Sequence, residues 1–360
     1  MAASVSSLKT PADARRAAFD ADDLINTLMR DGFVVFRGFF PKDVAEQARV
    51  ELKEWHARDI EARTRAGVDK NDSQHYHQFE SAAGESSLSR YSHVLVDVYG
   101  KSPTLDHMFE TVLTDPVSSK VIRAIAGEYF KIRGYNSRLM TGKPDELGQG
   151  WHRDSPGEFG IGFLLTDVPP GDNGATAVLP GSHLLPYDPQ ANCLFRDDGW
   201  HVTTPVSNRL KKLAIFNRLL EKKLMPRATG VSGTQGDLYI FLNDTWHGRQ
   251  PNIHGRETMV VLIGCYPTEF PFPEEVKSLP AEVVVKLPPA VREVVRLDRP
   301  PNEKKDTVIY MTLSRREPLQ RFGLFYWAAI ERQLLVAGAR REFLKLLRGW
   351  TGRAMGRIAG

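Results

Sequence analysis

The pattern of apolar and polar positions divides the chain into a helical N-terminal part and a β-rich central part. Residues 16–30 and 42–66 predict helices, and the second begins after Pro41, a residue type favoured at helix starts. Between them, residues 33–40 (FVVFRGFF) are β-branched and aromatic, which favours a strand. A further pair of helices is predicted over 105–128. We therefore expect several helices around one early strand before the central part begins.

From residue 130 onward the pattern changes to short β-rich runs separated by turns of Gly, Pro, Asp and Asn. The runs cover 130–141, 159–168, 174–180, 237–242 and 257–266, and short runs at 283–285 and 308–313 are predicted to add strands. This spacing is typical of an all-β barrel or sandwich. Two segments depart from it: residues 67–102 are polar and predict irregular structure, and residues 207–224 predict a basic inserted helix.

Composition excludes several classes of protein. The 360 residues include 48 Lys and Arg and 44 Asp and Glu, which gives a formal net charge of +4, and 41% are hydrophobic. That apolar content excludes a wholly disordered chain. Two cysteines, Cys193 and Cys265, exclude a disulfide scaffold or a thiolate zinc cage, and we expect Cys265 to be an inert core thiol. The N-terminus lacks the apolar stretch of a secretory signal, so we expect a cytoplasmic location.

The C-terminal segment is strongly basic. Residues 318–360 contain eight Lys and Arg against two Glu, beside an apolar stripe that includes Phe343 and Trp350. Two interpretations stay open, a helix packed on the barrel and an interfacial helix that lies on anionic lipid and gives peripheral membrane contact. A nucleic-acid partner is not expected, because no other feature supports one.

The main chemical signal is a set of two histidines and one aspartate. In an extended segment, residues two apart point to the same side, so His152 and Asp154 can reach one ion. His247 follows the run 237–242 and must come from a distant strand, which a closed barrel can bring close. Two imidazoles and one carboxylate can occupy one face of an octahedral iron, although zinc accepts the same ligands.

An arginine beyond the second histidine offers a site for a carboxylate. Residues 248–255 contain Gly, Pro and Asn and predict the loop of an antiparallel hairpin. That hairpin would place Arg256 near His247, where its guanidinium could clamp a carboxylate in bidentate fashion. His183, which ends the run 173–183, is expected to be structural and to order its turn by hydrogen bonds.

These motifs together resemble the phytanoyl-CoA dioxygenase family of Fe(II)/2-oxoglutarate-dependent oxygenases, and most closely its ectoine hydroxylase-like members. The residues that carry the resemblance are GWHRDS at 150–155, NGATAVLPGSH at 173–183, GDLYIFLNDTWHG at 236–248 and Arg256. The resemblance extends over about residues 25–270. It implies a double-stranded β-helix, also called a jelly roll or cupin-like fold. It also implies Fe(II) held by His152, Asp154 and His247.

The resemblance further implies how the cosubstrate is bound. Arg256 would pair with the distal carboxylate of 2-oxoglutarate, Asn136 stands where related enzymes have a Gln that contacts the cosubstrate, and Phe163 stands where an aromatic residue often flanks it. The sequence departs from the family at Asn136, which is one CH₂ shorter, in the nine-residue spacing from His247 to Arg256, and at Arg249, which replaces a frequent Ser. Binding of cosubstrate, binding of an anionic substrate and solvation are three open roles for Arg249.

The expected activity is that of a dioxygenase that uses O₂ to hydroxylate an unactivated C–H bond, with conversion of 2-oxoglutarate to succinate and CO₂. The carboxylate of Asp154 favours hydroxylation over halogenation, because related halogenases lack it. We expect a small-molecule, sugar or lipid-linked substrate, and the basic residues favour an anionic one. A zinc-type hydrolase or lyase on the same barrel, and a non-catalytic ligand-binding barrel, are the alternatives.

The expected domain organisation follows from this interpretation. We expect a flexible tail over residues 1–15 and a single catalytic jelly-roll domain with flanking helices over 16–315. Its motif core would lie at 130–266, with a helical insertion at about 185–232. A basic C-terminal helical segment would cover 316–360.

Overall fold

The computed structural model describes the chain in several ranges, which hold every residue discussed below. They are residues 16, 18–66, 77–81, 84–89, 92–140, 149–152, 154, 157–171, 174–184, 228–250, 252, 254–267, 281–295 and 307–309. Within these ranges, none of the helices combines the length and the apolar character needed to cross a membrane. The predicted tail over 1–15, the predicted helix over 207–224 and the basic segment over 316–360 lie outside the described residues.

The N-terminal helices and the first strand form close to where the sequence predicts them. Helix α2 (Ala21–Asp31) begins later than expected because Asp20 caps it, accepting hydrogen bonds from the backbone N–H groups of Asp22 and Asp23. Gly32, with a φ of 82°, ends the helix and leads into β1 (Phe33–Phe36). Helix α3 (Lys42–Arg65) confirms the prediction for 42–66.

The predicted helical pair is present as two separate helices, α4 (Pro103–Thr114) and α5 (Pro116–Ala126). Asp115 separates them, since its extended backbone stops α4 while its side chain accepts hydrogen bonds from the N–H groups of Val117 and Ser118. Proline in the first turn of each helix removes a donor that would otherwise lack a partner.

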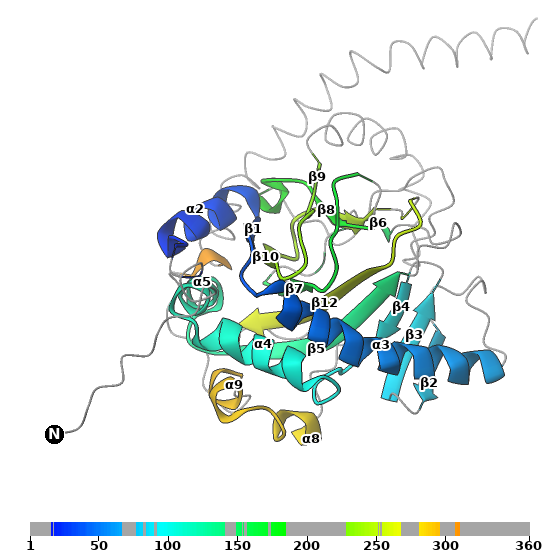
Figure 1. The fold of residues 1–360 in the computed structure, drawn as a ribbon. Helices are drawn as coiled ribbons and strands as arrows, with labels where there is room; N and C mark the ends of the chain where they lie inside the picture. Colours follow the sequence, from blue (N-terminus) through cyan, green and yellow to red (C-terminus); the bar gives the residue numbers. More distant parts are fainter. Residues whose placement is uncertain are drawn as a thin grey trace, which may run out of the picture. The chain divides into compact units, whose positions relative to one another are not determined.

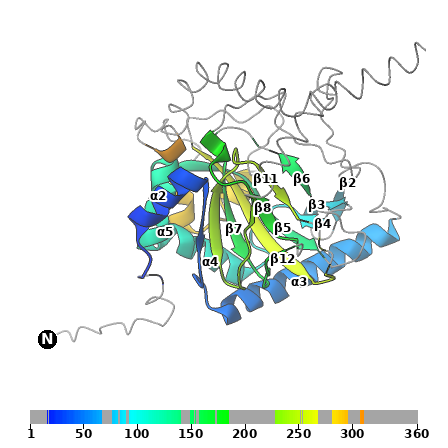
Figure 2. The same cartoon turned by 90° about the horizontal axis from the view of Figure 1, so that it is seen from above.

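Two antiparallel sheets form the β structure, as Figures 1 and 2 show. The eight-stranded sheet has the order β1-β10-β7-β12-β5-β4-β3-β2, and the four-stranded sheet has the order β6-β11-β8-β9. The larger sheet adds β2 (His77–Ser81), β3 (Gly84–Ser89), β4 (Ser92–Leu95), β5 (Phe130–Met140), β7 (Phe159–Leu164), β10 (Leu238–Leu242) and β12 (Thr258–Pro267) to β1. The smaller sheet contains β6 (Gln149–His152), β8 (Thr176–Val178), β9 (Thr229–Gly230) and β11 (His247–Arg249).

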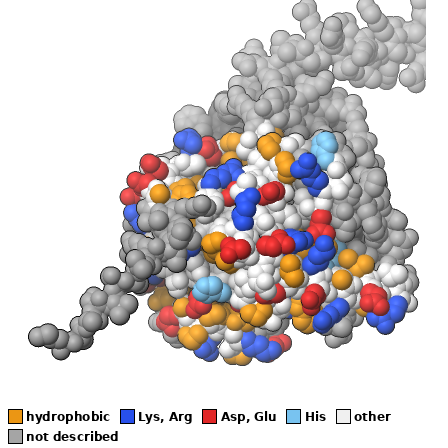
Figure 3. Space-filling model, viewed as in Figure 1, with side chains coloured by type: hydrophobic (Ala, Val, Ile, Leu, Met, Phe, Trp, Pro, Cys, Tyr) orange, Lys and Arg blue, Asp and Glu red, His pale blue; other side chains and the backbone are white. Residues whose placement is uncertain are grey.

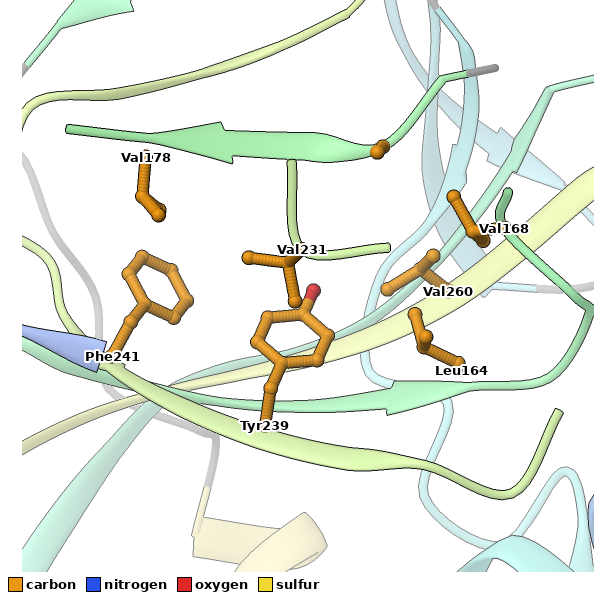
Figure 4. Packing of buried hydrophobic residues seen from close by; sticks show 8 residues of the cluster. Leu164, Val168, Val178, Val231, Tyr239, Phe241 and Val260 are labelled. Carbon is orange, nitrogen blue, oxygen red and sulfur yellow. The ribbon is translucent and has the colours of Figure 1, made fainter. Parts of the chain in front are cut away.

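Alternate residues of the central strands face two different cores. Between the sheets, Tyr239 and Phe241 of β10 pack with Val178 of β8, Val260 of β12 and Leu164 of β7 (Figure 4). Residues at the intervening positions face the helices, which lie on the other side of the larger sheet (Figures 1 and 2). This alternation decides which side chains can reach a site between the sheets.

The pairing of β1 with β10 is held at one end by a buried aspartate. The Asp237 carboxylate accepts hydrogen bonds from the backbone N–H groups of Gly38 (2.6 Å) and Thr234 (3.0 Å) and pairs with the Arg37 guanidinium at 2.8 Å. One side chain therefore ties the end of β1 to the turn that precedes β10.

The β-rich core is confirmed, and the helices before it make the described part a mixed α/β fold. Residues 77–95, expected to be irregular, contain β2, β3 and β4. β2 and β3 have polar sequences without an apolar alternation, so the hydrophobic pattern did not predict them as strands. The prediction of a strand at 283–285 is wrong, since Ala281–Val284 form helix α8, which is followed by α9 (Pro289–Val294). Val308 and Ile309 are buried but belong to neither sheet.

The predicted hairpin around residues 248–255 is also wrong. β11 pairs with β6 and β8, whereas β12 pairs with β5 and β7, so the connection crosses from one sheet to the other. Gly and Pro signal a turn, but they do not specify which strand becomes the partner.

The surface in Figure 3 shows Lys and Arg side chains interspersed with Asp and Glu. Ion pairs such as Lys53–Glu257 and Arg49–Glu257 join opposite charges from separate segments. In the part of the chain that the structure describes, this face of the molecule therefore carries no large patch of a single charge sign.

Candidate metal centre

The four-stranded sheet brings the two predicted histidine ligands together. β6 and β11 pair antiparallel, with His152 directly opposite His247. Residues paired in this way have Cα atoms about 4.5–5.5 Å apart. The structure describes the backbone of His152 and not its side chain, so the placement of this residue rests on the register.

The predicted carboxylate ligand lies beside the second histidine. Asp154 Oδ2 is 3.5 Å from His247 Nε2. The backbone N–H of Asp154 donates to the carbonyl of Asn243 at 3.0 Å, and the Asn243 side-chain amide donates to Asp154 Oδ2 at 3.3 Å. The turn after β10 thus holds both the backbone and the carboxylate of Asp154 next to β11.

Hydrogen bonding orients the His247 ring toward Asp154. Its Nδ1 lies 2.8 Å from the Thr245 carbonyl, which can only accept, so Nδ1 carries the proton. The lone pair of Nε2 then points toward Asp154, as a metal ligand requires. Phe241 packs edge-on against the ring, with centroids 5.3 Å apart. The imidazole is therefore fixed in both orientation and tautomer.

The donor set fits a divalent cation. Nε2 of His247 and Oδ2 of Asp154 are close enough to bind one ion, and His152 stands across the ladder from His247. Among the residues whose side chains the structure describes, no complete group of three His, Cys, Asp or Glu ligands is found. The third ligand is thus placed by backbone pairing.

A buried carboxylate that the sequence analysis missed lies near the centre. Glu158 is buried, its Oε1 accepts from Arg133 at 2.7 Å, and its Oε2 accepts from the Tyr266 hydroxyl at 2.7 Å. Burial, together with the negative charge of Asp154, raises the pKa of Glu158 to about 7, although Arg133 and Tyr266 partly offset this. The burial and the raised pKa of Glu158 could be found only from the tertiary structure, because Glu158 belongs to none of the sequence motifs.

The predicted cosubstrate residues fall in three different places. Asn136 lies opposite Leu262, on the face of the larger sheet that looks toward the smaller one. Phe163 faces the helix side instead, where its ring is 5.9 Å from that of Phe40, so its observed role is core packing. Arg256 is exposed in the connection between the two sheets.

Three other residues for which the sequence suggested a role are buried in the structure. Arg249 is buried, with 7% of its surface exposed, which excludes the solvated role. His183 is buried and lies 3.1 Å from the carbonyl of Met29, as expected for a structural histidine. Cys265 is buried, and burial raises the pKa of its thiol well above the usual value, in agreement with an inert thiol.

Comparison with known proteins identifies the family of this chain. The profile of the family described as phytanoyl-CoA dioxygenase (PhyH) matches residues 28–256, which is more than half of the chain. No match is found among curated proteins.

Three solved structures are similar at low sequence identity. The non-heme alpha-ketoglutarate-dependent carbocyclase SnoK from nogalamycin biosynthesis is 16% identical over 70% of this chain and 86% of its own, with a TM-score of 0.44. AviO1 from Streptomyces viridochromogenes Tue57 is 19% identical over 70% of this chain and 97% of its own, with a TM-score of 0.43. HygX from Streptomyces hygroscopicus, determined with nickel and 2-oxoglutarate bound, is 14% identical over 69% of this chain and 87% of its own, with a TM-score of 0.45. On the strength of the family match, the chain belongs to the phytanoyl-CoA dioxygenase (PhyH) family of Fe(II)/2-oxoglutarate-dependent oxygenases.

Proposed function

We propose that this protein is an Fe(II)/2-oxoglutarate-dependent dioxygenase that hydroxylates an unactivated C–H bond, with iron held by His152, Asp154 and His247. The observation that supports it most is the approach of Asp154 Oδ2 to within 3.5 Å of His247 Nε2, with His152 paired across the ladder. We further propose that the two sheets constitute a double-stranded β-helix. Iron with 2-oxoglutarate and O₂ would supply the oxidising power, with succinate and CO₂ as coproducts.

The residues of this chain would position the ligands and limit access of water. The Thr245 carbonyl keeps the proton of His247 on Nδ1, and Asn243 holds the Asp154 carboxylate. Phe241 shields one side of the imidazole. Asp154 itself is partly exposed, so one side of the centre remains accessible. A rigid ligand set with one accessible side suits binding of a cosubstrate and then of a substrate.

The presence of Asp154 also bears on the type of reaction. A carboxylate ligand fills the position that halide occupies in related halogenases, which supports hydroxylation. We propose a small-molecule, sugar or lipid-linked substrate that carries an anionic group, since the cationic Arg249 is buried on the strand that bears His247.

Anaerobic titration of the purified protein with Fe(II) and then with 2-oxoglutarate tests the proposal. A weak visible absorption band should appear only when both are present, and it should bleach on admission of O₂ as succinate forms. His152→Ala and Asp154→Ala should each abolish iron retention while the far-UV circular dichroism stays unchanged. His254→Ala is the matched control, because His254 is an exposed histidine in the connection after β11.

Two results would contradict the proposal. One is a wild-type protein that binds zinc tightly and shows no band with Fe(II) and 2-oxoglutarate, which would favour a hydrolytic or binding role. The other is normal iron retention in Asp154→Ala, which would remove Asp154 from the ligand set.

A further inference from the structure

A bulge in β5 turns the Arg133 side chain toward the space between the two sheets. In the ladder of β5 with β12, Gly134 lies opposite Gly264 and Ile132 lies opposite Cys265. Arg133 is the extra residue between these two pairs. Bulges of this kind redirect a side chain and are frequent beside active sites. The position of Arg133 therefore follows from a local irregularity of the backbone, not from the regular alternation along the strand.

The face of β12 that Arg133 covers is the face that looks toward the smaller sheet. Gly264 lies opposite Gly160 of β7, and a Cβ built on Gly160 would meet the ring of Phe241, which belongs to the core between the sheets. A Cβ built on Gly264 would lie 3.7 Å from Arg133 Cδ and 3.3 Å from Glu158 Oε1. Glycine at position 264 thus leaves room for these two side chains on the inner face of the larger sheet.

A buried carboxylate holds the Arg133 guanidinium from one side. Nη1 of Arg133 donates to Glu158 Oε1 at 2.7 Å and to Oε2 at 2.8 Å, and the Tyr266 hydroxyl donates to the same Oε2 at 2.7 Å. The Glu158 side chain is 2% exposed and the Arg133 side chain is 38% exposed. Within the described part of the chain, Nε and Nη2 of Arg133 make no hydrogen bond. These two groups form one edge of the guanidinium, and such an edge can bind an oxyanion in bidentate fashion.

A pair of the same kind elsewhere in the chain has a different role. Arg37 also pairs with a buried carboxylate, that of Asp237, but this carboxylate accepts hydrogen bonds from backbone N–H groups as well. In the ranges that the structure describes, the Glu158 carboxylate accepts hydrogen bonds only from the side chains of Arg133 and Tyr266. Glu158 therefore orients a guanidinium and does not tie two backbone segments together.

The Arg133–Glu158 pair adjoins the proposed metal centre. The backbone N–H of Asn243 donates to the Glu158 carbonyl at 2.8 Å, and the Asn243 side-chain amide donates to Asp154 Oδ2 at 3.3 Å. Burial opposes the rise in the pKa of Arg133, and the charges of Glu158 and Asp154 produce it, so Asp154 lies within electrostatic range of the guanidinium. Asp154 and Arg133 are both partly exposed. A guanidinium edge and a proposed metal ligand thus lie near each other, and solvent reaches both.

We propose that Arg133 binds an oxyanion group of the substrate, a carboxylate, sulfonate or phosphate, beside the metal centre, and that Glu158 and Tyr266 position its guanidinium. The inference rests on the proposed function, because the substrate must lie next to the iron that Asp154 helps to hold. A divalent ion bound to Asp154 offsets the negative charge of that carboxylate, so an incoming anion meets less repulsion there. A guanidinium that is already held in one orientation also loses little freedom when the anion binds.

The test uses two small probes of nearly equal shape in place of the unidentified substrate. Methanesulfonate carries an oxyanion, whereas dimethyl sulfone has a methyl group in place of the charged oxygen. Their binding to protein loaded with Fe(II) and 2-oxoglutarate, kept free of O₂ and of added salt, is followed by the broadening of their methyl proton signals near the paramagnetic metal. The wild type should bind methanesulfonate about 10-fold or more tightly than dimethyl sulfone, the scale of hydrogen bonds to a charged group.

Two variants at position 133 test the residue itself. Arg133→Met should weaken methanesulfonate binding about 10-fold or more, because both the charge and the donors are removed. It should leave the affinities for dimethyl sulfone, Fe(II) and 2-oxoglutarate unchanged, which a general structural defect would not do. Arg133→Lys keeps the charge without the bidentate edge and should show an intermediate loss. If Arg133→Met fails to fold because Glu158 is left buried without its counter-charge, the double variant Arg133→Met with Glu158→Gln removes both charges and should show the same loss.

Arg37→Met is the matched control. The Arg37 side chain is 57% exposed and pairs with a carboxylate that is 1% exposed, but the pair lies at the opposite end of β10 from Asn243. This variant removes the same charge and should change the binding of either probe by less than about 2-fold, since a distant exposed charge is screened.

The outcomes separate this inference from the proposed function. Wild-type affinity for methanesulfonate in Arg133→Met would overturn it, because the oxyanion would then bind elsewhere. Equal binding of the two probes by a wild-type protein that holds Fe(II) and 2-oxoglutarate would also overturn it, as would an equal loss in Arg37→Met and Arg133→Met. A wild-type protein that binds no 2-oxoglutarate in the presence of Fe(II) would instead refute the proposed function.

Discussion

Helix α3 carries two ion pairs with the same spacing and opposite environments. Asp59 and Arg63 pair at 2.7 Å with side chains that are 0% and 1% exposed. Glu54 and Arg58 pair at 3.6 Å with side chains that are 68% and 60% exposed. The Asp59 carboxylate also accepts from His93 Nε2 at 2.5 Å. One helix therefore provides a test of how burial changes the contribution of an ion pair.

Asp59→Asn should lower the free energy of unfolding by about 3–5 kcal/mol, because it leaves a buried guanidinium without its nearest counter-charge. Glu54→Gln should cost about 1 kcal/mol or less, since water already solvates both partners. Both changes are nearly isosteric and lie on the same helix, so differences in helix propensity contribute little.

The assay is equilibrium urea unfolding followed by tryptophan fluorescence, with iron and cosubstrate absent. It should be run at about pH 8, because burial lowers the pKa values of His56 and His93 below the usual 6.5. Below pH 6.5 the unfolded chain takes up protons that the folded protein does not, so these groups make stability fall as the pH falls. At pH 8 both histidines are neutral in both states, and the comparison isolates the ion pairs. A loss in Asp59→Asn no larger than that in Glu54→Gln would refute the reasoning.

Three further changes have defined outcomes. Glu158 has a pKa of about 7 in the folded protein against an ordinary value of 4.5, so the folded state holds the extra proton between these values. The unfolding free energy of wild type minus that of Glu158→Gln should therefore decrease as the pH rises from about 4.5 to 7, and a flat difference in urea titrations would contradict this. Gly174→Ala should lower the melting temperature more than Gly100→Ala, because both have φ near 74° but only the first Cβ would meet a neighbouring atom, at 2.7 Å. Equal shifts in the two variants would show that the contact is relieved without cost. Asp237→Asn should cost about 2–3 kcal/mol, since an amide cannot accept all of the bonds that the carboxylate accepts, and an unchanged thermal unfolding curve would contradict that role.

The sequence by itself determined the local elements and indicated the chemistry of the proposed ligand set. Capping and turn residues act within a few positions, so α3 and the split between α4 and α5 follow from nearby side chains such as Asp115. The i, i+2 spacing of His152 and Asp154 likewise predicts that they share a side, because it depends only on extended backbone. The motifs around them were specific enough to indicate the family, which the family match then confirmed.

Only the tertiary structure decided which strands are partners and which cations are buried. The hairpin predicted after His247 failed because β11 and β12 belong to different sheets, a long-range pairing that turn residues do not encode. That crossing leaves Arg256 in solvent and buries Arg249 between the sheets. Side chains alternate along β7, and this alternation places Phe163 on the face of the sheet that packs against the helices. The local sequence around Phe163 is compatible with either face of the sheet. Burial depends on what packs against a residue from elsewhere in the chain, and for this reason the free energy of placing a charge at position 249 or 256 could not be read from the local sequence.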